Sequence, residues 1–189
     1  MSVSLVKGQK ISLDKSGSGL SRVRMGLGWD AIKKKGLFGK RDQEIDLDAS
    51  CVLFAGDGIA DVIYFGKLTS EDGSVRHTGD NLTGEGDGDD ESVIVDLSAV
   101  PAHVTSLVFT VSSFSGQTFN EVENAFCRLV DETTNAEMAR FTLTGGGTHT
   151  AMVMSRLYRH DSAWKMSAIG EPCEGRTLKD MLPAIAAHA

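Results

Sequence analysis

The chain has 189 residues, with 19 Lys and Arg against 26 Asp and Glu, and its net charge is −7. A hydrophobic fraction of 41% excludes a disordered chain, and no apolar run approaches the ~20 residues of a transmembrane helix. Three widely spaced cysteines without a CxxC pair favour a reducing, cytoplasmic compartment, and nothing marks the N-terminus for secretion. This length predicts a single domain spanning residues 1–189.

Alternation of apolar and polar residues, which is typical of β-strands with one buried face, recurs along most of the chain. It is clearest at residues 45–53, 93–97 and 107–111. Further strands are expected at 3–6, 10–13, 21–29, 62–65, 126–131, 137–143, 151–158 and 163–169. Glycine-rich and Asx turn signals separate these runs. So many short strands predict a mainly β fold, an antiparallel two-sheet β-sandwich with a few short helices.

Helix signals are few. Thr118-Phe119-Asn120-Glu121 is a capping box, and apolar residues at helical spacing after it predict a short helix as far as Phe126. A second short helix is expected from Thr177 to Leu182, where Pro183 would end it.

Charge is strongly segregated along the chain. Residues 1–41 carry ten Lys and Arg and two acids, whereas residues 42–127 carry seventeen acids and only Lys67 and Arg76 as basic residues. A compact fold can pair the basic N-terminal part with some of these acids. The remainder would have to be solvated or neutralised by a bound cation.

The densest acidic segment is residues 79–91, in which glycines alternate with oxygen-bearing side chains. Its potential ligands are Asp80, Asn81, Glu85, Asp87, Asp89, Asp90 and Glu91. Calcium takes ~6–8 oxygen ligands in flexible geometry, and glycines let a backbone curl around an ion. An EF-hand is excluded: counted from Asp80 as position 1, the residues at positions 3, 5 and 6 do not fit that motif. The segment indicates a loop-built metal site, with a solvated acidic loop as the alternative.

Two further acids lie outside the loop, on a predicted strand. Asp46 and Asp48 are separated by one residue, so their carboxylates point to the same face of the strand, away from Leu47. A strand fixes the direction of such side chains in advance. We therefore expect Asp46 and Asp48 to share the metal site of the 79–91 loop, with Asp30 as a third contributor. Solvated acids on an open sheet face are the alternative.

Known catalytic motifs are absent from the sequence. Gly26-Leu27-Gly28 lacks the third glycine of a dinucleotide fingerprint, and no GxSxG, HExxH or Walker sequence occurs. The five histidines are scattered, and Cys51 lies in phase with a buried strand face, where inert packing is expected. No catalytic and no cofactor-binding residues are predicted.

A basic run at residues 33–41 contains Lys33, Lys34, Lys35, Lys40 and Arg41. It can meet phosphates or anionic lipid, so peripheral membrane association stays open. A mobile surface loop is the favoured interpretation. Nucleic acid is not an expected partner because the protein as a whole is acidic.

Several motifs along the chain are shared with one known family. They are Val3-Ser4-Leu5-Val6-Lys7-Gly8, Gly26-Leu27-Gly28-Trp29-Asp30, Asp46-Leu47-Asp48-Ala49-Ser50 and His77-Thr78-Gly79-Asp80-Asn81-Leu82-Thr83-Gly84. With them the sequence resembles the TerD family of bacterial tellurium-resistance and stress-response proteins. The resemblance implies a β-sandwich that binds calcium through clustered acids, with other stress-response proteins as expected partners. It does not imply an enzyme.

The metal role that the resemblance implies extends to more side chains than one calcium ion needs, so two ions are expected. The implied ligands are Asp30, Asp46, Asp48, Asp80, Asn81, Asp87, Asp89, Asp90 and Glu91. The leading hypothesis is a calcium-dependent binding module. The alternative is a metal-dependent enzyme that hydrolyses a phosphoester or nucleotide with the same acids. Thiol chemistry on tellurite is disfavoured, because of the three cysteines only Cys127 is followed directly by a basic residue.

Overall fold

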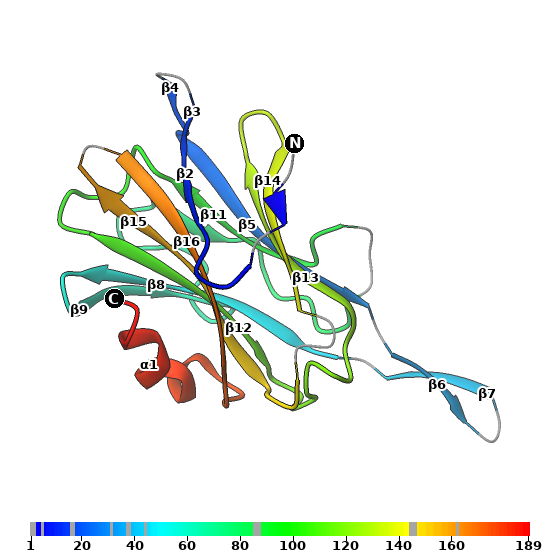
Figure 1. The fold of residues 1–189 in the computed structure, drawn as a ribbon. Helices are drawn as coiled ribbons and strands as arrows, with labels where there is room; N and C mark the ends of the chain where they lie inside the picture. Colours follow the sequence, from blue (N-terminus) through cyan, green and yellow to red (C-terminus); the bar gives the residue numbers. More distant parts are fainter. Residues whose placement is uncertain are drawn as a thin grey trace.

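The structure is a computed structural model and describes residues 3–4, 6–15, 18–30, 32–36, 39–43, 45–84, 88–143, 147–161 and 163–189. Side chains are described for these residues apart from 3, 14–15, 18–19, 32–36 and 39–43. Two six-stranded sheets form a β-sandwich, which confirms the predicted fold class (Figure 1).

In the first sheet, the long strand formed by Arg22–Asp30 lies near the centre. Its order is β1 (Val3–Ser4), β14 (Ala136–Thr142), β13 (Glu123–Asp131), β5 (Arg22–Asp30), β11 (Glu91–Asp96) and β10 (Val75–His77). All neighbours pair antiparallel except β1 and β14, which are parallel.

The second sheet is entirely antiparallel. Its order is β2 (Lys10–Ser12), β16 (Ala163–Cys173), β15 (Ala151–His160), β12 (Ser106–Ser113), β8 (Leu47–Ala55) and β9 (Gly58–Ile63). Strand β9 pairs with β8 only from Cys51 onward. The N-terminal part of β8 therefore has no β9 neighbour at its edge.

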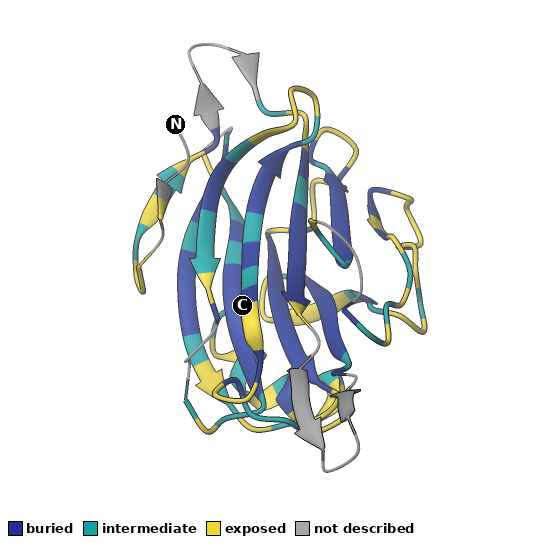
Figure 2. Ribbon diagram, turned by 90° about the vertical axis from the view of Figure 1, so that its right-hand side faces the viewer, coloured by how far each residue is buried: buried dark blue, intermediate teal, exposed yellow. Residues whose placement is uncertain are grey.

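The apolar core fills the space between the two sheets, and Figure 2 shows the buried strands that enclose it. Alternate residues of β5, among them Leu27 and Trp29, belong to this core and are at most 5% exposed. The opposite side of β5 carries Gly26 and Gly28. A Cβ atom at Gly26 would collide with the Asp89 carboxylate, and one at Gly28 with the Gly88 carbonyl. These glycines let the acidic segment lie directly on β5.

Strand β8 is buried on both faces, which differs from the single buried face predicted for it. Val52 and Phe54 belong to a second apolar cluster together with Met181 and Ile185 of helix α1 (Leu178–Ala186). Figure 1 shows α1, in red, beside the second sheet, and the helix contacts β12 and β15. The one-face prediction failed because a helix distant in sequence covers the outer side.

One of the two predicted helices is present. Helix α1 starts after the N-cap Thr177 as expected, but it continues through Pro183 to Ala186 because Met181 and Ile185, on either side of the proline, are buried in apolar contacts. The helix expected at 118–126 is wrong. Glu121 does accept a hydrogen bond from the Thr118 backbone, yet residues 119–121 make only a turn before strand β13 begins.

Two short ribbons stand apart from the main sheets. One pairs β3 (Asp14–Lys15) with β4 (Ser18–Gly19), and the other pairs β6 (Ile32–Gly36) with β7 (Gly39–Gln43). The described residues of the basic run at 33–41, which was expected as a mobile loop, thus lie in the paired strands β6 and β7, which extend beyond the two sheets in Figure 1.

Candidate metal centre

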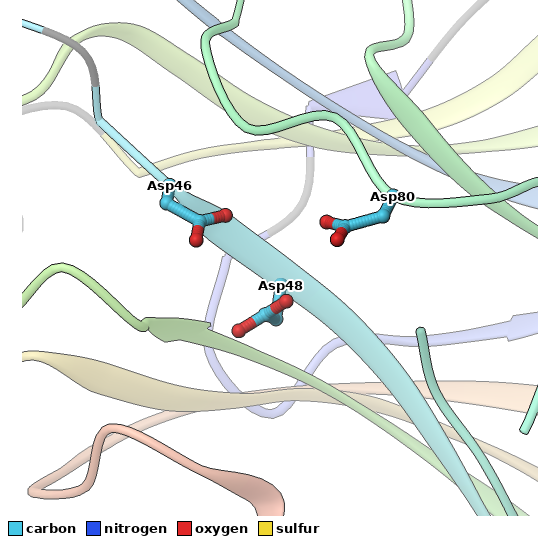
Figure 3. Close-up of side chains that lie close together, drawn as sticks. All are labelled: Asp46, Asp48 and Asp80. Carbon is cyan, nitrogen blue, oxygen red and sulfur yellow. The ribbon is translucent and has the colours of Figure 1, made fainter. Parts of the chain in front are cut away.

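Three carboxylates meet where the start of β8 lies beside the segment that follows β10. Asp48 lies on β8, Asp46 directly precedes that strand, and Asp80 belongs to the acidic segment (Figure 3). One oxygen of each carboxylate lies within 4.8 Å of the others. The cluster of Asp46, Asp48 and Asp80 is the one group in the described part of the chain with this metal-like arrangement. It places the strand pair and the acidic segment side by side, as the sequence predicted.

Several oxygens of this cluster have no partner. Asp46 Oδ1 and Asp48 Oδ2 are buried and make no hydrogen bond, and Asp48 as a whole is 4% exposed. A buried polar atom without a partner is costly. The donor set consists of hard carboxylate oxygens, and together with these unpartnered atoms it fits a divalent cation such as calcium.

The protonation of the cluster reflects this crowding. Burial, followed by the negative charges of Asp46, Glu91 and Asp80, raises the pKa of Asp48 to about 8. Burial and the charges of Asp80 and Glu91 raise the pKa of Asp46 to about 6. A bound cation would favour the ionised carboxylates and lower both values.

Backbone contacts fix Asp46 in this position. The Asp46 amide donates to Ser115 Oγ at 3.0 Å, and the Phe114 amide donates to the Asp46 carbonyl at 2.9 Å. Phe114 is 41% exposed, and its ring lies edge-to-face with that of Phe65 at 6.1 Å. The main chain of Asp46 is therefore hydrogen-bonded to that of Phe114, whose ring belongs to a pair of exposed aromatic side chains.

Glu91 is fully buried and ties the acidic segment to β8. Its Oε2 accepts from the Ala49 amide of β8 at 2.8 Å, and its Oε1 accepts from the Asn81 amide at 3.1 Å. His77 Nε2 lies 3.3 Å from Glu91 Oε2 but without hydrogen-bond geometry, while His77 Nδ1 accepts from the Gly79 amide. Glu91 stands next to the cluster, and its oxygens are engaged within the fold.

Asp89 is held by two arginines and does not join the cluster. Arg24 on β5 contacts Asp89 Oδ2 at 2.7 Å, and Arg128 on β13 contacts Asp89 Oδ1 at 2.6 Å. The Asp89 side chain is 3% exposed, and its negative charge raises the pKa of Arg128. No Lys or Arg lies near Asp89 along the chain, and its two partners come from other strands, one of them from the basic N-terminal part.

Asp90, Asn81 and Asp30 have other contacts. Asp90 accepts from the Trp29 amide at 2.9 Å and from Asn81 Nδ2 at 3.1 Å. Burial, and then the charges of Asp30 and its acidic neighbours, raise the pKa of Asp90 despite the Trp29 hydrogen bond. Asn81 Oδ1 accepts from the amides of Thr83 and Gly84, which closes a turn.

Asp30, at the exposed end of β5, accepts from Asn124 Nδ2 at 2.6 Å. Its negative charge contributes to the raised pKa of Asp90, and neither Asp30 nor Asp90 belongs to the Asp46–Asp48–Asp80 cluster. Asp87, also predicted as a ligand, lies outside the described residues.

The Asp46–Asp48–Asp80 cluster separates two hollows. Asp80 lines an open groove of about 750 Å³ that also contains Arg24 and Asn81. Asp48 lines a cavity of about 330 Å³ between the second sheet and α1. This cavity was not predictable from sequence, since its walls come from β8, β9, β12 and α1.

The cysteines have no reactive environment. Burial raises the pKa of Cys127 to about 12 and that of Cys51 still further, and Cys173 also has a raised pKa. All three are free thiols. The packing role expected for Cys51 agrees with its complete burial.

Fold and site together define a β-sandwich protein with a carboxylate cluster suited to a divalent cation. The sequence matches the TerD domain over residues 1–184, and the chain belongs to the TerD family. The family includes tellurium-resistance and stress-response proteins.

Two curated relatives span almost the whole chain. The tellurium resistance protein TerZ of Serratia marcescens is 56% identical over 184 residues, covering 95% of this chain and 94% of the relative. The stress response protein SCP2 of Bacillus subtilis (strain 168) is 40% identical, covering 96% and 98%. Neither name is that of an enzyme.

A solved structure confirms the fold. The crystal structure of a homologue of telluride resistance protein (TerD) from Streptomyces coelicolor A3(2) has a TM-score of 0.71 and 21% identity, covering 83% of this chain and 92% of that chain. At this identity the likeness supports the β-sandwich alone. Among the described residues, no helix is long and apolar enough to cross a membrane.

Proposed function

We propose that this protein is a calcium-dependent binding module of the tellurium-resistance and stress response, without catalytic activity. The single observation that carries the proposal is the Asp46–Asp48–Asp80 cluster with its buried, unpartnered oxygens. One calcium ion there would neutralise carboxylates that burial and mutual repulsion disfavour. Three carboxylates supply only part of the ~6–8 oxygens that calcium takes, so water and main-chain oxygens would have to complete its shell. Calcium tolerates such a mixed and flexible shell better than magnesium, which demands a strict octahedron.

The ion would act by joining two parts of the fold. Asp80 belongs to the segment that follows β10, whereas Asp46 and Asp48 belong to the start of β8. Binding would order the segment against β8 and steady Phe114, whose amide donates to Asp46. The exposed Phe65 and Phe114 rings then offer a contact surface for other stress-response proteins.

A second ion, expected from the number of acids, would have to lie near Asp30 and Asp90. Asp89 is already neutralised by Arg24 and Arg128. This use of both guanidinium groups also favours a binding role over phosphoester hydrolysis, because neither arginine is free to clamp a phosphate. A cytoplasmic location is proposed on the three free thiols.

Calorimetric titration with calcium and with magnesium tests the proposal. We expect wild-type protein to bind calcium in preference to magnesium, and Asp48→Asn to weaken calcium binding by at least ~10-fold because a charged ligand is lost. Asp57→Asn, at an exposed acid in the β8–β9 turn, is the matched control and should bind as wild type. Equal calcium affinity in wild type and Asp48→Asn would reject the cluster as the site.

A further inference from the structure

The cavity beside Asp48 has the features of a small-molecule site that the calcium proposal does not use. Its volume is about 330 Å³, at the lower end of the ~300–1,000 Å³ found for ligand pockets. Val62 and Phe65 line it on one side, and Leu178 and Leu182 of α1 line it on the other. These walls are apolar, so they can take the hydrocarbon part of a ligand.

The polar side chains that line this cavity from the second sheet lie close together. Asp48 and Ser50 of β8 and Ser112 of β12 all line it, and they are 4%, 3% and 2% exposed. Asp48↔Ser112 is a directly paired position between the two strands. Because Asp48 Oδ2 has no hydrogen-bond partner, a buried acceptor is left for a donor that the protein itself does not supply.

The charge around Asp48 determines which kind of hydrogen-bond donor a ligand should bring. When all three carboxylates of the cluster are ionised, they carry one negative charge more than a divalent ion can neutralise, and Glu91 lies close by. Lys179 also lines the cavity, but it is exposed, so water screens its charge. A cationic ligand would complete the charge balance, whereas an anion would meet like charge at the sheet.

We propose that this cavity binds a small organic cation. Its primary ammonium group pairs with Asp48, and its apolar chain lies between Phe65 and Leu182. A charge-assisted hydrogen bond from the ammonium to Asp48 supplies orientation, and the Ser50 and Ser112 hydroxyls accept its other protons. Tyr64 and Phe65 add aromatic faces that attract cations. The inference goes beyond the proposed calcium site and shares Asp48 with it; without calcium, the ammonium group itself would favour the ionised form of Asp48, as a bound metal would.

Three probes with the same tail and different head groups test this assignment. Hexylammonium, 1-hexanol and hexanoate are titrated into the full-length protein by calorimetry, once with calcium and once with a chelator. We expect hexylammonium to bind at least ~10-fold more tightly than hexanol, and hexanoate to bind most weakly. Equal affinities for hexylammonium and hexanol would overturn the proposal, because the cavity would then recognise only the hydrocarbon tail.

Two variants locate the binding. Leu182→Trp fills the cavity and should abolish binding of hexylammonium, whereas Leu68→Trp makes the same change at a side chain that is 42% exposed and outside the cavity, and should bind as wild type. Asp48→Asn should weaken hexylammonium ~10-fold and leave hexanol within about two-fold. Unchanged hexylammonium affinity in Leu182→Trp would place any binding elsewhere and reject the inference.

The same titrations separate this inference from the calcium proposal. Hexylammonium binding with no calcium binding would refute the calcium proposal alone. Calcium binding with no preference for hexylammonium would refute the ammonium site alone. Asp57→Asn serves as the common control for both ligands.

Discussion

Two acidic sites lie on either side of one short segment, and they differ in where their positive charge comes from. At Asp89 the fold supplies two arginines, and both carboxylate oxygens are paired while the side chain is 3% exposed. At Asp46, Asp48 and Asp80 the described residues supply no basic partner, and two oxygens are buried without a hydrogen bond. Residues 79–91 look uniformly acidic in sequence, yet in the structure Asp89 belongs to an internal ion pair whereas Asp80 belongs to a cluster of three carboxylates.

The comparison shows that acid density alone does not locate a cation site. A carboxylate with a built-in guanidinium partner stabilises the fold and needs no metal. A carboxylate cluster without a partner costs stability until a cation arrives. The same chemical change should therefore have opposite effects at the two sites.

The largest effect is expected from Asp89→Asn. This variant leaves Arg24 and Arg128 without their shared charge partner, which should cost ~3 kcal/mol and lower the melting temperature by ~6–12 °C for a chain of this size. Differential scanning calorimetry with a chelator measures it. The matched change Asp48→Asn should raise the melting temperature under the same conditions, and a loss of stability in both variants would contradict the comparison.

Calcium should raise the melting temperature of the wild-type protein by ~5–10 °C at about 100 times its dissociation constant, and magnesium should raise it less. Asp48→Asn should lose this gain because a ligand of the cluster is removed. Asp89→Asn should keep most of this gain, although its melting temperature without calcium is lower than that of the wild type. Identical melting curves with calcium and with chelator would show that the cluster is not a metal site.

The pH dependence of stability should identify the unpaired cluster. In the folded chain the pKa of Asp48 is raised to about 8 and that of Asp46 to about 6, whereas both acids ionise near pH 4 when unfolded. The folded state then binds more protons, so the contribution of these residues to stability falls as the pH rises from about 4 to about 8.

We expect Asp48→Asn to exceed the wild type in melting temperature by ~3–6 °C at pH 8, with the difference shrinking toward pH 5. Calcium should abolish the trend in the wild type. A difference that is independent of pH would show that Asp48 is not protonated in the folded, metal-free protein.

The smallest effect is expected from Asp80→Asn without metal. Asp80 is exposed, so relief of its repulsion with Asp46 and Asp48 is screened by water and should raise the melting temperature by only ~1–3 °C. The same variant should nevertheless weaken calcium binding in a titration. Full calcium affinity in Asp80→Asn would remove the acidic segment from the site.

The fold was predictable from sequence where local pattern decides the structure. Alternating apolar residues identified β5, β8, β11 and β12 within a few residues, because a strand with a core face repeats every second residue. The helix at 118–126 failed for the opposite reason. Its capping contact forms at Thr118 and Glu121, but pairing of β13 with β5 and β14 overrides the local helical signal.

The candidate site was predictable in part. The strand geometry of Asp46 and Asp48 places both on one face, and the structure sets Asp80 beside them. The pairing of Asp89 with Arg24 and Arg128 was not visible, since it depends on which strands neighbour each other. The segregation of charge along the chain was the one sequence feature that pointed to this pairing, because Arg24 comes from the basic N-terminal part.

A crystal structure of the calcium-loaded protein tests the central claim most directly. We expect a calcium ion among Asp46, Asp48 and Asp80 with oxygen distances of ~2.3–2.6 Å, while Asp89 keeps its contacts to Arg24 and Arg128. A calcium ion bound by Asp89, with the arginines displaced and no ion at Asp48, would contradict the account.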